Sequence, residues 1–333
     1  MGVCMRKFGV VIGVALIACF VAGIVALAQP APARDTLLLV VSKNEQMTIF
    51  KVEDRTLTAI KKLPIGKYAL EVWVAPNGNR AYVSNGDSNS ITVVDLDTLE
   101  VVATITHPDL LVPDGGTMTP DSKTMYVVSE KRNSVFVIDA QTNKVVKEIP
   151  VQIEVPRRVL LSPDLRKLYV AGNKTPAIAV VDLATGKQER AIKVGREPRG
   201  GLVFLPDGKT IVNASVEDDT LSLVNAETGE VTLTIGVPQS PQRVFVAPGG
   251  APIFVGSRMR SGVTRINDPF KHDDHKFAAA GDFLWGMAVT KDFKTAFVAS
   301  ANAATVSIID LVEMKTVMIV PVDKDSTGLA LRQ

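Results

Sequence analysis

Arginine recurs in the short connections of this sequence, most often within two residues of a proline. Guanidinium groups hold carboxylate and phosphate groups through paired hydrogen bonds, so arginines that converge in space make a site for an anion. Trp285, within the segment 283–286, offers a flat ring surface for stacking beside such a site. We therefore predict an anion-binding site made by Trp285 and these arginines: Arg157, Arg158, Arg196, Arg199, Arg243, Arg258 and Arg260.

Residues suited to nucleophilic or metal chemistry are sparse by comparison. The segment 272–275 reads His-Asp-Asp-His and holds two of the three histidines, so His272, Asp273 and His275 are weak candidates for binding zinc or a similar cation. Their spacing is not that of a helical metal motif, and we expect a solvated polar loop instead. The sequence has no Gly-rich phosphate loop after a strand and no haem-attachment motif. We expect no cofactor and lean toward a protein without catalytic activity.

A repeated strand pattern must position these groups. It returns seven times, at intervals of 42 to 44 residues, and its copies begin at Leu39, Tyr82, Tyr126, Tyr169, Val212, Phe254 and Phe297. Each unit contains short runs rich in Val, Ile and Thr that are separated by turn residues, as expected for antiparallel strands joined by hairpins. Four such strands at a period near 43 are typical of one propeller blade. The sequence therefore predicts an all-β, seven-bladed β-propeller.

Two further features of the repeat make local predictions. An Asp or Asn stands thirteen residues after the lead residue in six copies, where its side chain should accept hydrogen bonds from backbone amides of the following turn. The chain also begins its first unit with a second strand, at 37–42, and ends with a lone first strand, at 327–332. These two strands should pair, so that the last segment closes the ring against the first.

Several segments resemble the YVTN-type β-propeller repeat family. They are Tyr82-Val83-Ser84-Asn85, Ile91-Thr92-Val93-Val94-Asp95, Val101-Val102-Ala103-Thr104-Ile105 and Pro120-Asp121-Ser122-Lys123. The resemblance covers nearly all of residues 37 to 332 and implies a seven-bladed propeller of the kind that bacteria export to the periplasm or the surface layer. The family motif is structural, so the resemblance implies no catalytic residue.

Propellers usually bind ligands where the central channel opens on the face made by the fourth-to-first and second-to-third strand connections. The arginines named above belong to those connections, whereas Trp73 lies within a strand and should pack in the core. We predict a binding or interaction scaffold whose channel mouth takes an anionic ligand or polyanion, with nucleic acid among the candidate partners.

Two alternatives stay open at this point. One is an enzyme similar to metal-dependent lactone hydrolases, whose candidate ligands are acids at the starts of first strands: Glu71, Asp114, Asp282 and Asp325. The other is a structural or assembly protein of the cell envelope, for which the channel mouth would have no role.

The first 28 residues have the layout of a secretory signal, with Arg6 and Lys7 before an apolar run and Ala-Leu-Ala before the expected cleavage point. Residues 29–36 then form a linker, and 37–333 form the propeller. We expect a periplasmic or secreted monomer without a membrane span in the cleaved form. Cys19, in Leu-Ile-Ala-Cys, keeps open a lipoprotein signal, and the apolar run is also long enough for an uncleaved anchor.

Cleavage would also change the chemistry of the chain. It would remove both cysteines, Cys4 and Cys19, so the mature protein would have no thiol and no disulfide. The formal charge would fall from +2 to zero, because Arg6 and Lys7 are lost from 37 basic and 35 acidic residues. Any positive potential must then come from the local arrangement of charges.

Overall fold

A computed structural model of the protein describes residues 1–2, 34–271 and 275–333. The chain divides into two units, 1–34 and Asp35–Gln333, and the second is the compact one described below. Residues 3–28 of the predicted signal segment, with Cys4 and Cys19, lie outside the described residues, as do His272 and Asp273. In the described part of the chain, no helix has the length and apolar character needed to cross a membrane.

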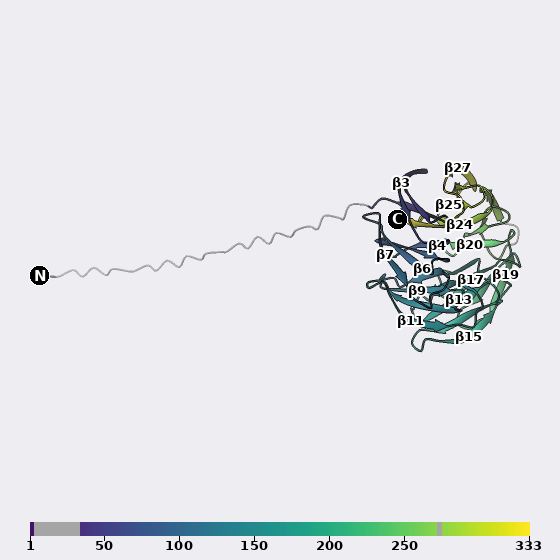
Figure 1. The fold of residues 1–333 in the computed structure, drawn as a ribbon, viewed down its shortest axis with the longest axis horizontal. Coiled ribbons are helices and arrows are strands. Elements are labelled where there is room, and N and C mark those ends of the chain that lie inside the picture. The colour runs from purple at the N-terminus through teal and green to yellow at the C-terminus, as the bar shows by residue number, and fades with distance from the viewer. Residues whose placement is uncertain (3–33, 272–274) are drawn as a thin grey trace. The chain divides into compact units, whose positions relative to one another are not determined.

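In residues 35–271 and 275–333 the second unit has 28 strands in seven sheets of four antiparallel strands each, which confirms the predicted seven-bladed propeller (Figure 1). Blades 1 and 2 comprise β28 (Ser326–Arg332), β1 (Leu37–Ser42), β2 (Gln46–Glu53) and β3 (Thr56–Pro64), then β4 (Ala69–Val74), β5 (Arg80–Asn85), β6 (Ser90–Asp95) and β7 (Glu100–Thr106). Blades 3 and 4 comprise β8 (Pro113–Met118), β9 (Thr124–Ser129), β10 (Ser134–Asp139) and β11 (Lys144–Pro150), then β12 (Pro156–Leu161), β13 (Lys167–Gly172), β14 (Ala177–Asp182) and β15 (Lys187–Lys193). Blades 5 and 6 comprise β16 (Gly201–Phe204), β17 (Thr210–Ser215), β18 (Thr220–Asn225) and β19 (Val231–Gly236), then β20 (Pro241–Val246), β21 (Ile253–Ser257), β22 (Gly262–Ile266) and β23 (His275–Ala279). Blade 7 comprises β24 (Leu284–Val289), β25 (Thr295–Ser300), β26 (Thr305–Asp310) and β27 (Lys315–Pro321).

The core of the propeller lies between the blades. Seven apolar clusters fill the seven interfaces between neighbouring sheets. The middle strands, such as β5 and β9, are buried on both faces, whereas the outermost strand of each blade, such as β7, is mostly exposed. Each blade therefore depends on its neighbours for the burial of its apolar surface, as expected for a repeat architecture.

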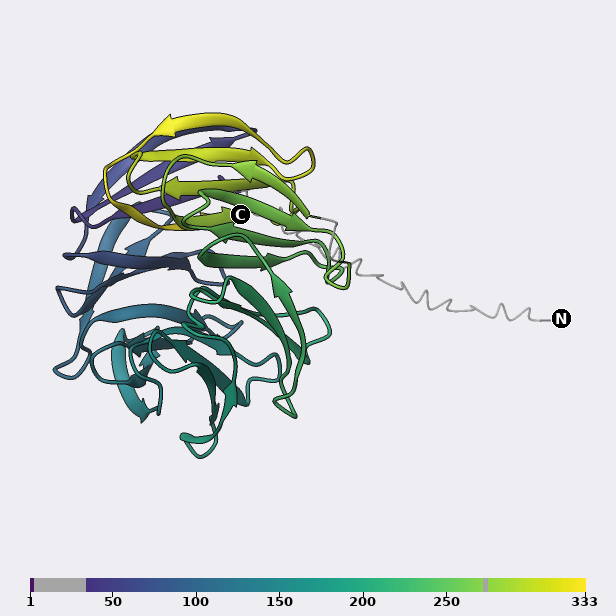
Figure 2. The ribbon, with the colours of Figure 1, turned by 90° about the vertical axis from the view of Figure 1, so that its right-hand side faces the viewer.

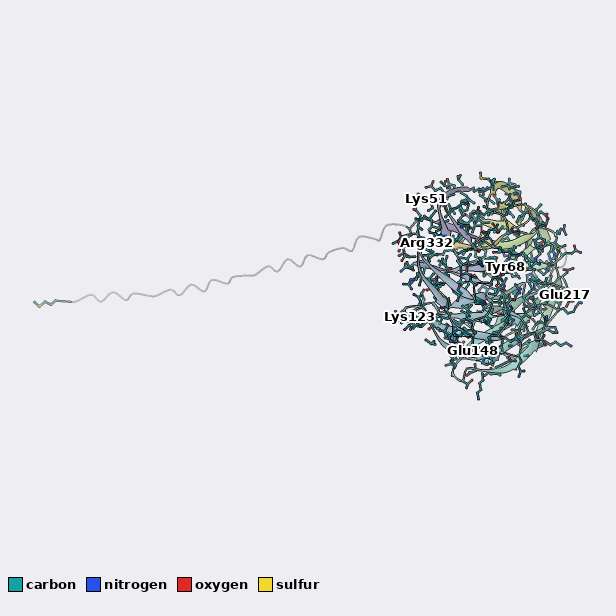
Figure 3. The ribbon with its side chains drawn as sticks, viewed as in Figure 1. Lys51, Tyr68, Lys123, Glu148, Glu217 and Arg332 are labelled. Atoms are coloured by element: carbon teal, nitrogen blue, oxygen red, sulfur yellow. The ribbon has the colours of Figure 1, made fainter. Side chains whose placement is uncertain are left out.

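The predicted ring closure is confirmed. β28 pairs antiparallel with β1, with Leu39 opposite Ala330, and the last strands of the chain lie beside the first ones (Figure 2). Arg332, labelled in Figure 3, stabilises this seam: its Nη1 donates to the carbonyl of Leu96 at 2.6 Å and to the Asp97 carboxylate at 2.9 Å. The Thr327 hydroxyl donates to the carbonyl of Ala69 at 2.8 Å. The final strand thus connects blade 1 to blade 2 as well as completing blade 1.

Asp and Asn residues that stand thirteen positions after the lead residues (Asx residues) accept backbone hydrogen bonds from the following turn, as predicted. At Asp139, for example, Oδ1 accepts the backbone N–H of Gln141 at 2.8 Å and of Thr142 at 3.0 Å. The same pattern holds at Asp95, Asn225 and Asp310. These N–H donors lower the pKa of the Asp139 carboxyl, because they stabilise its ionised form. The residues therefore shape turns and do not converge on a common ligand.

Every first strand is reached through a residue with a left-handed backbone conformation, and none of these residues is glycine. The seven residues are Tyr68, Val112, Val155, Glu197, Ser240, Phe283 and Asp325. In each blade, the carbonyl of this residue accepts the N–H of the residue that follows the second strand; Ser240, for instance, accepts from Arg258 at 2.8 Å. β-Branched residues such as Val155 rarely adopt this conformation, which costs of order 1–3 kcal/mol. The repeated contact fixes the second-to-third connections against the starts of the first strands, where the channel opens.

Candidate functional site: the channel mouth

Three charged residues and four glycines occupy one level of the first strands. This level is marked by the first-strand residue that pairs with the second strand two positions after the lead residue of the repeat. The charged residues there are Glu71, which pairs with Ser84, Arg158, which pairs with Ala171, and Arg243, which pairs with Gly256. Three other blades place Gly201, Gly286 and Gly328 there, and Gly115 stands at the matching position of the sequence.

The glycines let neighbouring strands approach closely around the axis. A Cβ atom on Gly201 would lie 2.7 Å from Val244 Cγ2, and one on Gly286 would lie 2.8 Å from the Thr327 carbonyl oxygen. The space near the axis is left to the three long charged side chains at this level.

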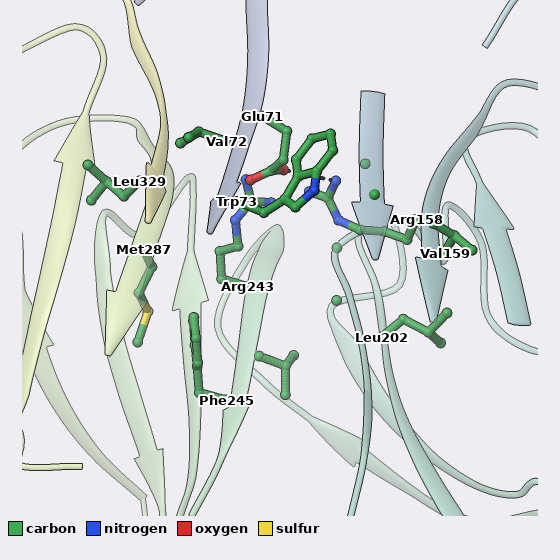
Figure 4. A pocket seen from close by; sticks show the side chains of 15 residues that line it. Glu71, Val72, Trp73, Arg158, Val159, Leu202, Arg243, Phe245, Met287 and Leu329 are labelled. Atoms are coloured by element: carbon green, nitrogen blue, oxygen red, sulfur yellow. Dashed lines mark hydrogen bonds and ion pairs between the residues drawn. The ribbon is translucent and has the colours of Figure 1, made fainter. Parts of the chain in front are cut away.

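These three side chains form one ion-paired group, with the Glu71 carboxylate between two guanidinium groups (Figure 4). Arg243 Nη2 donates to both Glu71 oxygens, at 3.1 and 2.9 Å, and Arg158 Nη1 lies 3.1 Å from Glu71 Oε2. Burial lowers the pKa of Arg243 to about 10, and the guanidinium remains charged at neutral pH. Glu71 is the carboxylate that compensates this buried charge.

Arg157 and Arg199 extend the group around the channel. Arg157 donates to Asp114 at 3.1 Å and lies 3.1 Å from Glu130, the residue that follows β9. Arg199 donates to Gln242 at 3.1 Å and lies 3.2 Å from Glu197. The arginines of blades 4, 5 and 6 thus face a shared space rather than separate neighbours. Five of the seven predicted arginines line this space together with Trp285, namely Arg157, Arg158, Arg199, Arg243 and Arg258.

The other two predicted arginines lie elsewhere. Arg196 is exposed and is paired with Asp218 at 2.7 Å and Glu217 at 3.4 Å. Arg260 is exposed and stacks over Phe277 of β23, at 4.4 Å from the ring centroid. Both therefore serve contacts outside the channel mouth.

Two cations at the mouth have no carboxylate partner within the described residues. Arg258 lies over the Trp285 ring, 4.4 Å from its centroid, and Lys43 Nζ lies 4.7 Å from the centroids of both Trp285 and Tyr68. Cation–π contacts of this kind hold a charge in place without cancelling it. Burial, with the nearby charges of Arg199, Arg243 and Arg157, lowers the pKa of Arg258 to about 10, so this group is also charged at neutral pH.

The mouth consequently keeps a local positive charge. Five arginines and Lys43 face four carboxyl groups, which leaves a formal charge of +2 when all four are ionised. The space among these side chains holds only about 10 Å³, so the ion-paired layer nearly closes the channel at this level. On the side of the mouth, the layer is bordered by Trp285, Lys43 and Arg258.

The acids proposed for a metal-dependent hydrolase are divided between different environments. Glu71 and Asp114 bind arginines, which compete directly with a cation for their oxygens. Asp282 instead accepts from Asn302 at 3.4 Å, and Asp325 is one of the left-handed residues described above. Among the described residues, no group of three or more His, Cys, Asp or Glu is placed to hold a metal ion. Of the weak metal candidates, His275 begins β23.

The stability of the protein should depend on pH through Glu130, which lies at the channel mouth. Burial raises its pKa to about 7, against an ordinary value of 4.5. Between these two pH values the folded state keeps a proton that the unfolded state has lost, so the free energy of unfolding falls as the pH rises, by at most about 1.4 kcal/mol per pH unit. We expect Glu130→Gln to lack this contribution. The difference in the free energy of unfolding between variant and wild type, measured in urea, should therefore change between pH 5 and pH 7. Parallel pH profiles for the two proteins would contradict the assignment.

Lys43 and Glu130 are not among the site residues predicted from the sequence, although the repeat contains a signal for both. Lys43, Glu130 and Arg258 each stand four residues after the lead residue of their repeat, at Leu39, Tyr126 and Phe254. Aligning the repeats on that position would place Lys43 and Glu130 at the channel mouth with Arg258.

The fold and site define a seven-bladed propeller with an arginine–carboxylate layer across one end of its channel. The sequence model of DUF5074, a domain of unknown function, matches residues 34–195. These residues contain the whole of blades 2 to 4 and the strands β1 to β3 of blade 1. No curated protein matches the sequence.

Solved structures share the fold. One is hydrazine synthase from Kuenenia stuttgartiensis, with 22% identity and a TM-score of 0.69, over 79% of this chain and 89% of that chain. Another is a functionally unknown protein from Desulfotomaculum acetoxidans DSM 771, with 15% identity and a TM-score of 0.77, over 89% of this chain and 98% of that chain. At these identities the likeness is one of fold alone.

Proposed function

We propose that the protein is a non-catalytic binding scaffold that holds an anionic group at its channel mouth. The observation that carries this proposal is the pair of cations, Lys43 and Arg258, held against Trp285 without a carboxylate partner in the described part of the chain. The other arginines supply a positive field, but their hydrogen bonds are largely committed to Glu71, Asp114, Glu130 and Glu197.

The size of the ligand follows from the packing of the layer. Because only about 10 Å³ is free among its side chains, the anion must belong to a ligand that rests on the mouth rather than inside it. An extended polyanion meets this requirement, since its charged groups can approach Lys43 and Arg258 beside the Trp285 ring while the rest stays in solvent. Phosphate groups on a polymer would bind with strong salt dependence, because binding releases counterions.

The test is a binding titration with two labelled probes, inorganic polyphosphate and a short duplex DNA, followed by fluorescence anisotropy. We expect a Lys43→Gln/Arg258→Gln double variant to bind at least about tenfold more weakly, since each cation contacts the ligand directly. The matched control is Arg196→Gln/Arg260→Gln, which removes the same formal charge from positions outside the mouth. Equal losses in the two double variants, or no loss in the first, would refute the proposal.

Substitution of Arg157, Arg199 and Arg243 is a poor test of binding. Arg243 is largely buried against Glu71, and Arg157 against Asp114 and Glu130, so their removal would strand buried carboxylates. Such a variant would report on folding. Lys43 and Arg258 have no carboxylate partner in residues 34–271 and 275–333, and their replacement leaves the ion-paired layer intact.

We further propose that the chain is a YVTN-type repeat protein and that it is exported, with the cleaved, monomeric form as its mature state. The proposal is supported by the residues quoted above and by the signal-like segment 1–28. Mass spectrometry of the N-terminus of the protein purified from its own cells checks the second part. A mass that begins at Gln29 agrees with it, a lipid on Cys19 indicates an anchored form, and an intact Met1 contradicts export by cleavage.

A further inference from the structure

A second cavity lies on the other side of the ion-paired layer. Its volume is about 300 Å³, and it extends along the first strands away from the mouth, from Glu71 toward Trp73 and from Arg243 toward Phe245 (Figure 4). This volume is at the lower end of the range for sites that bind small molecules. The cavity shares Glu71, Arg158 and Arg243 with the layer but does not contain Lys43, Arg258 or Trp285.

The walls and the end of this cavity differ in chemistry. The walls carry apolar side chains from six first strands, Trp73, Val159, Leu202, Phe245, Met287 and Leu329. The end is formed by the Glu71 carboxylate and the two guanidinium groups that flank it, which together carry a formal charge of +1. An apolar tube that ends in one net positive charge matches a molecule with an apolar body and one negative charge.

Hydrogen-bond donors at the charged end are available for such a group. Arg158 uses its Nη1 for Glu71 and for the Arg157 carbonyl, and its other guanidinium nitrogens make no hydrogen bond within the described residues. The Trp73 Nε1 atom is buried and also has no acceptor there. The indole is fixed by Tyr82, with ring centroids 6.2 Å apart, and by Gly116, where a Cβ atom would lie 2.6 Å from the ring.

From these observations we propose that the channel binds a small amphipathic molecule, with a flat apolar body between Trp73 and Phe245 and a single acidic group at Arg158 and the Trp73 N–H. The charge selects a monoanion, because Glu71 would repel a group that carried more negative charge toward it. This site is separate from the one proposed at the mouth, and either can exist without the other.

The experiment compares two fluorescent probes that share an aromatic body. 1-Anilinonaphthalene-8-sulfonate carries one sulfonate, and N-phenyl-1-naphthylamine carries none. We expect the native protein to bind the sulfonate probe saturably, and Arg158→Gln to weaken that binding about tenfold while leaving the neutral probe unchanged, as for the loss of one charge-assisted hydrogen bond. Arg158→Gln leaves the Glu71–Arg243 pair in place, so the fold should be retained.

The position of the probe is tested separately. In a Trp285→Phe protein, Trp73 is the remaining tryptophan, and bound sulfonate probe should quench its emission by energy transfer. Leu202→Trp should block the cavity and weaken both probes; if that variant does not fold, a loss of sulfonate binding in Arg158→Gln that is absent from Lys43→Gln/Arg258→Gln decides. The proposal is overturned if both probes bind equally well, if Arg158→Gln has no effect, or if Lys43→Gln/Arg258→Gln abolishes binding of the sulfonate probe.

Discussion

A chain that ends at Asp325, and so lacks β28, is expected to lose the closed ring and to self-associate. β28 fills the edge of β1, and most of its residues are buried, including Leu329 and Ala330. Its removal also breaks the contacts of Arg332 with Leu96 and Asp97. An unpaired, apolar β1 edge is a template for pairing with other chains. The loss should approach the whole stability of a typical domain, about 5–15 kcal/mol.

Size-exclusion chromatography and far-ultraviolet circular dichroism measure this outcome. The control is deletion of Gln333 alone, an exposed residue whose contacts are with Lys291. A synthetic peptide of residues 326–333 added during refolding should recover monomer from the truncated chain. If the truncated chain is a monomer that melts like the full-length protein, the closing strand does not hold the ring together.

Glu71→Ala is expected to destabilise the propeller by about 3–5 kcal/mol, the cost of leaving a buried charge without its partner. Glu71 is bound by Arg243 through two hydrogen bonds and lies 3.1 Å from Arg158, and Arg243 is only 12% exposed. The free energy of unfolding in urea is the quantity to measure.

A double variant separates the charge effect from lost packing. Replacing Arg243 by Met together with Glu71→Ala should restore part of the lost stability, because the uncompensated guanidinium is removed. Glu217→Ala is the control, since its partner Arg196 is 65% exposed and an ion pair of this kind contributes about 0–1 kcal/mol. A Glu71→Ala effect as small as that of Glu217→Ala would show that the layer does not depend on its central carboxylate.

The fold could be predicted from the sequence because its information is periodic. Strand positions, turn Asx residues and the pairing of the two chain ends all follow from one interval near 43 residues, and each is present in the structure. The gathering of five arginines and Trp285 in one space follows from the same periodicity, because equivalent positions of a propeller converge on its axis.

The cancellation of charge within the site could not be predicted in this way. Glu71 and Arg243 are 172 positions apart, and their contact depends on the reach of two side chains across the channel rather than on any local spacing. From the sequence, Glu71 and Asp114 are candidate ligands of a metal-dependent enzyme and the arginines are candidates for an anion site, whereas the structure joins them as ion pairs.

Trp73 also has a role in the structure that its position in the sequence does not predict. Its mid-strand position predicts core packing, and it does stack on Tyr82. The ring also lines the channel cavity, because first strands of a propeller border the axis as well as their own blade. Periodicity identifies such positions but does not show how much space neighbouring side chains leave open.

The proposed anion site at the channel mouth is tested most directly through Trp285, against which Lys43 and Arg258 lie. In a Trp73→Phe protein, Trp285 is the remaining tryptophan, and its emission reports on the mouth. Titration with inorganic polyphosphate should change this emission saturably, with the same midpoint as the anisotropy titration, and the change should vanish in the Lys43→Gln/Arg258→Gln background. Polyphosphate binding that leaves the emission of Trp285 unaltered would contradict the account.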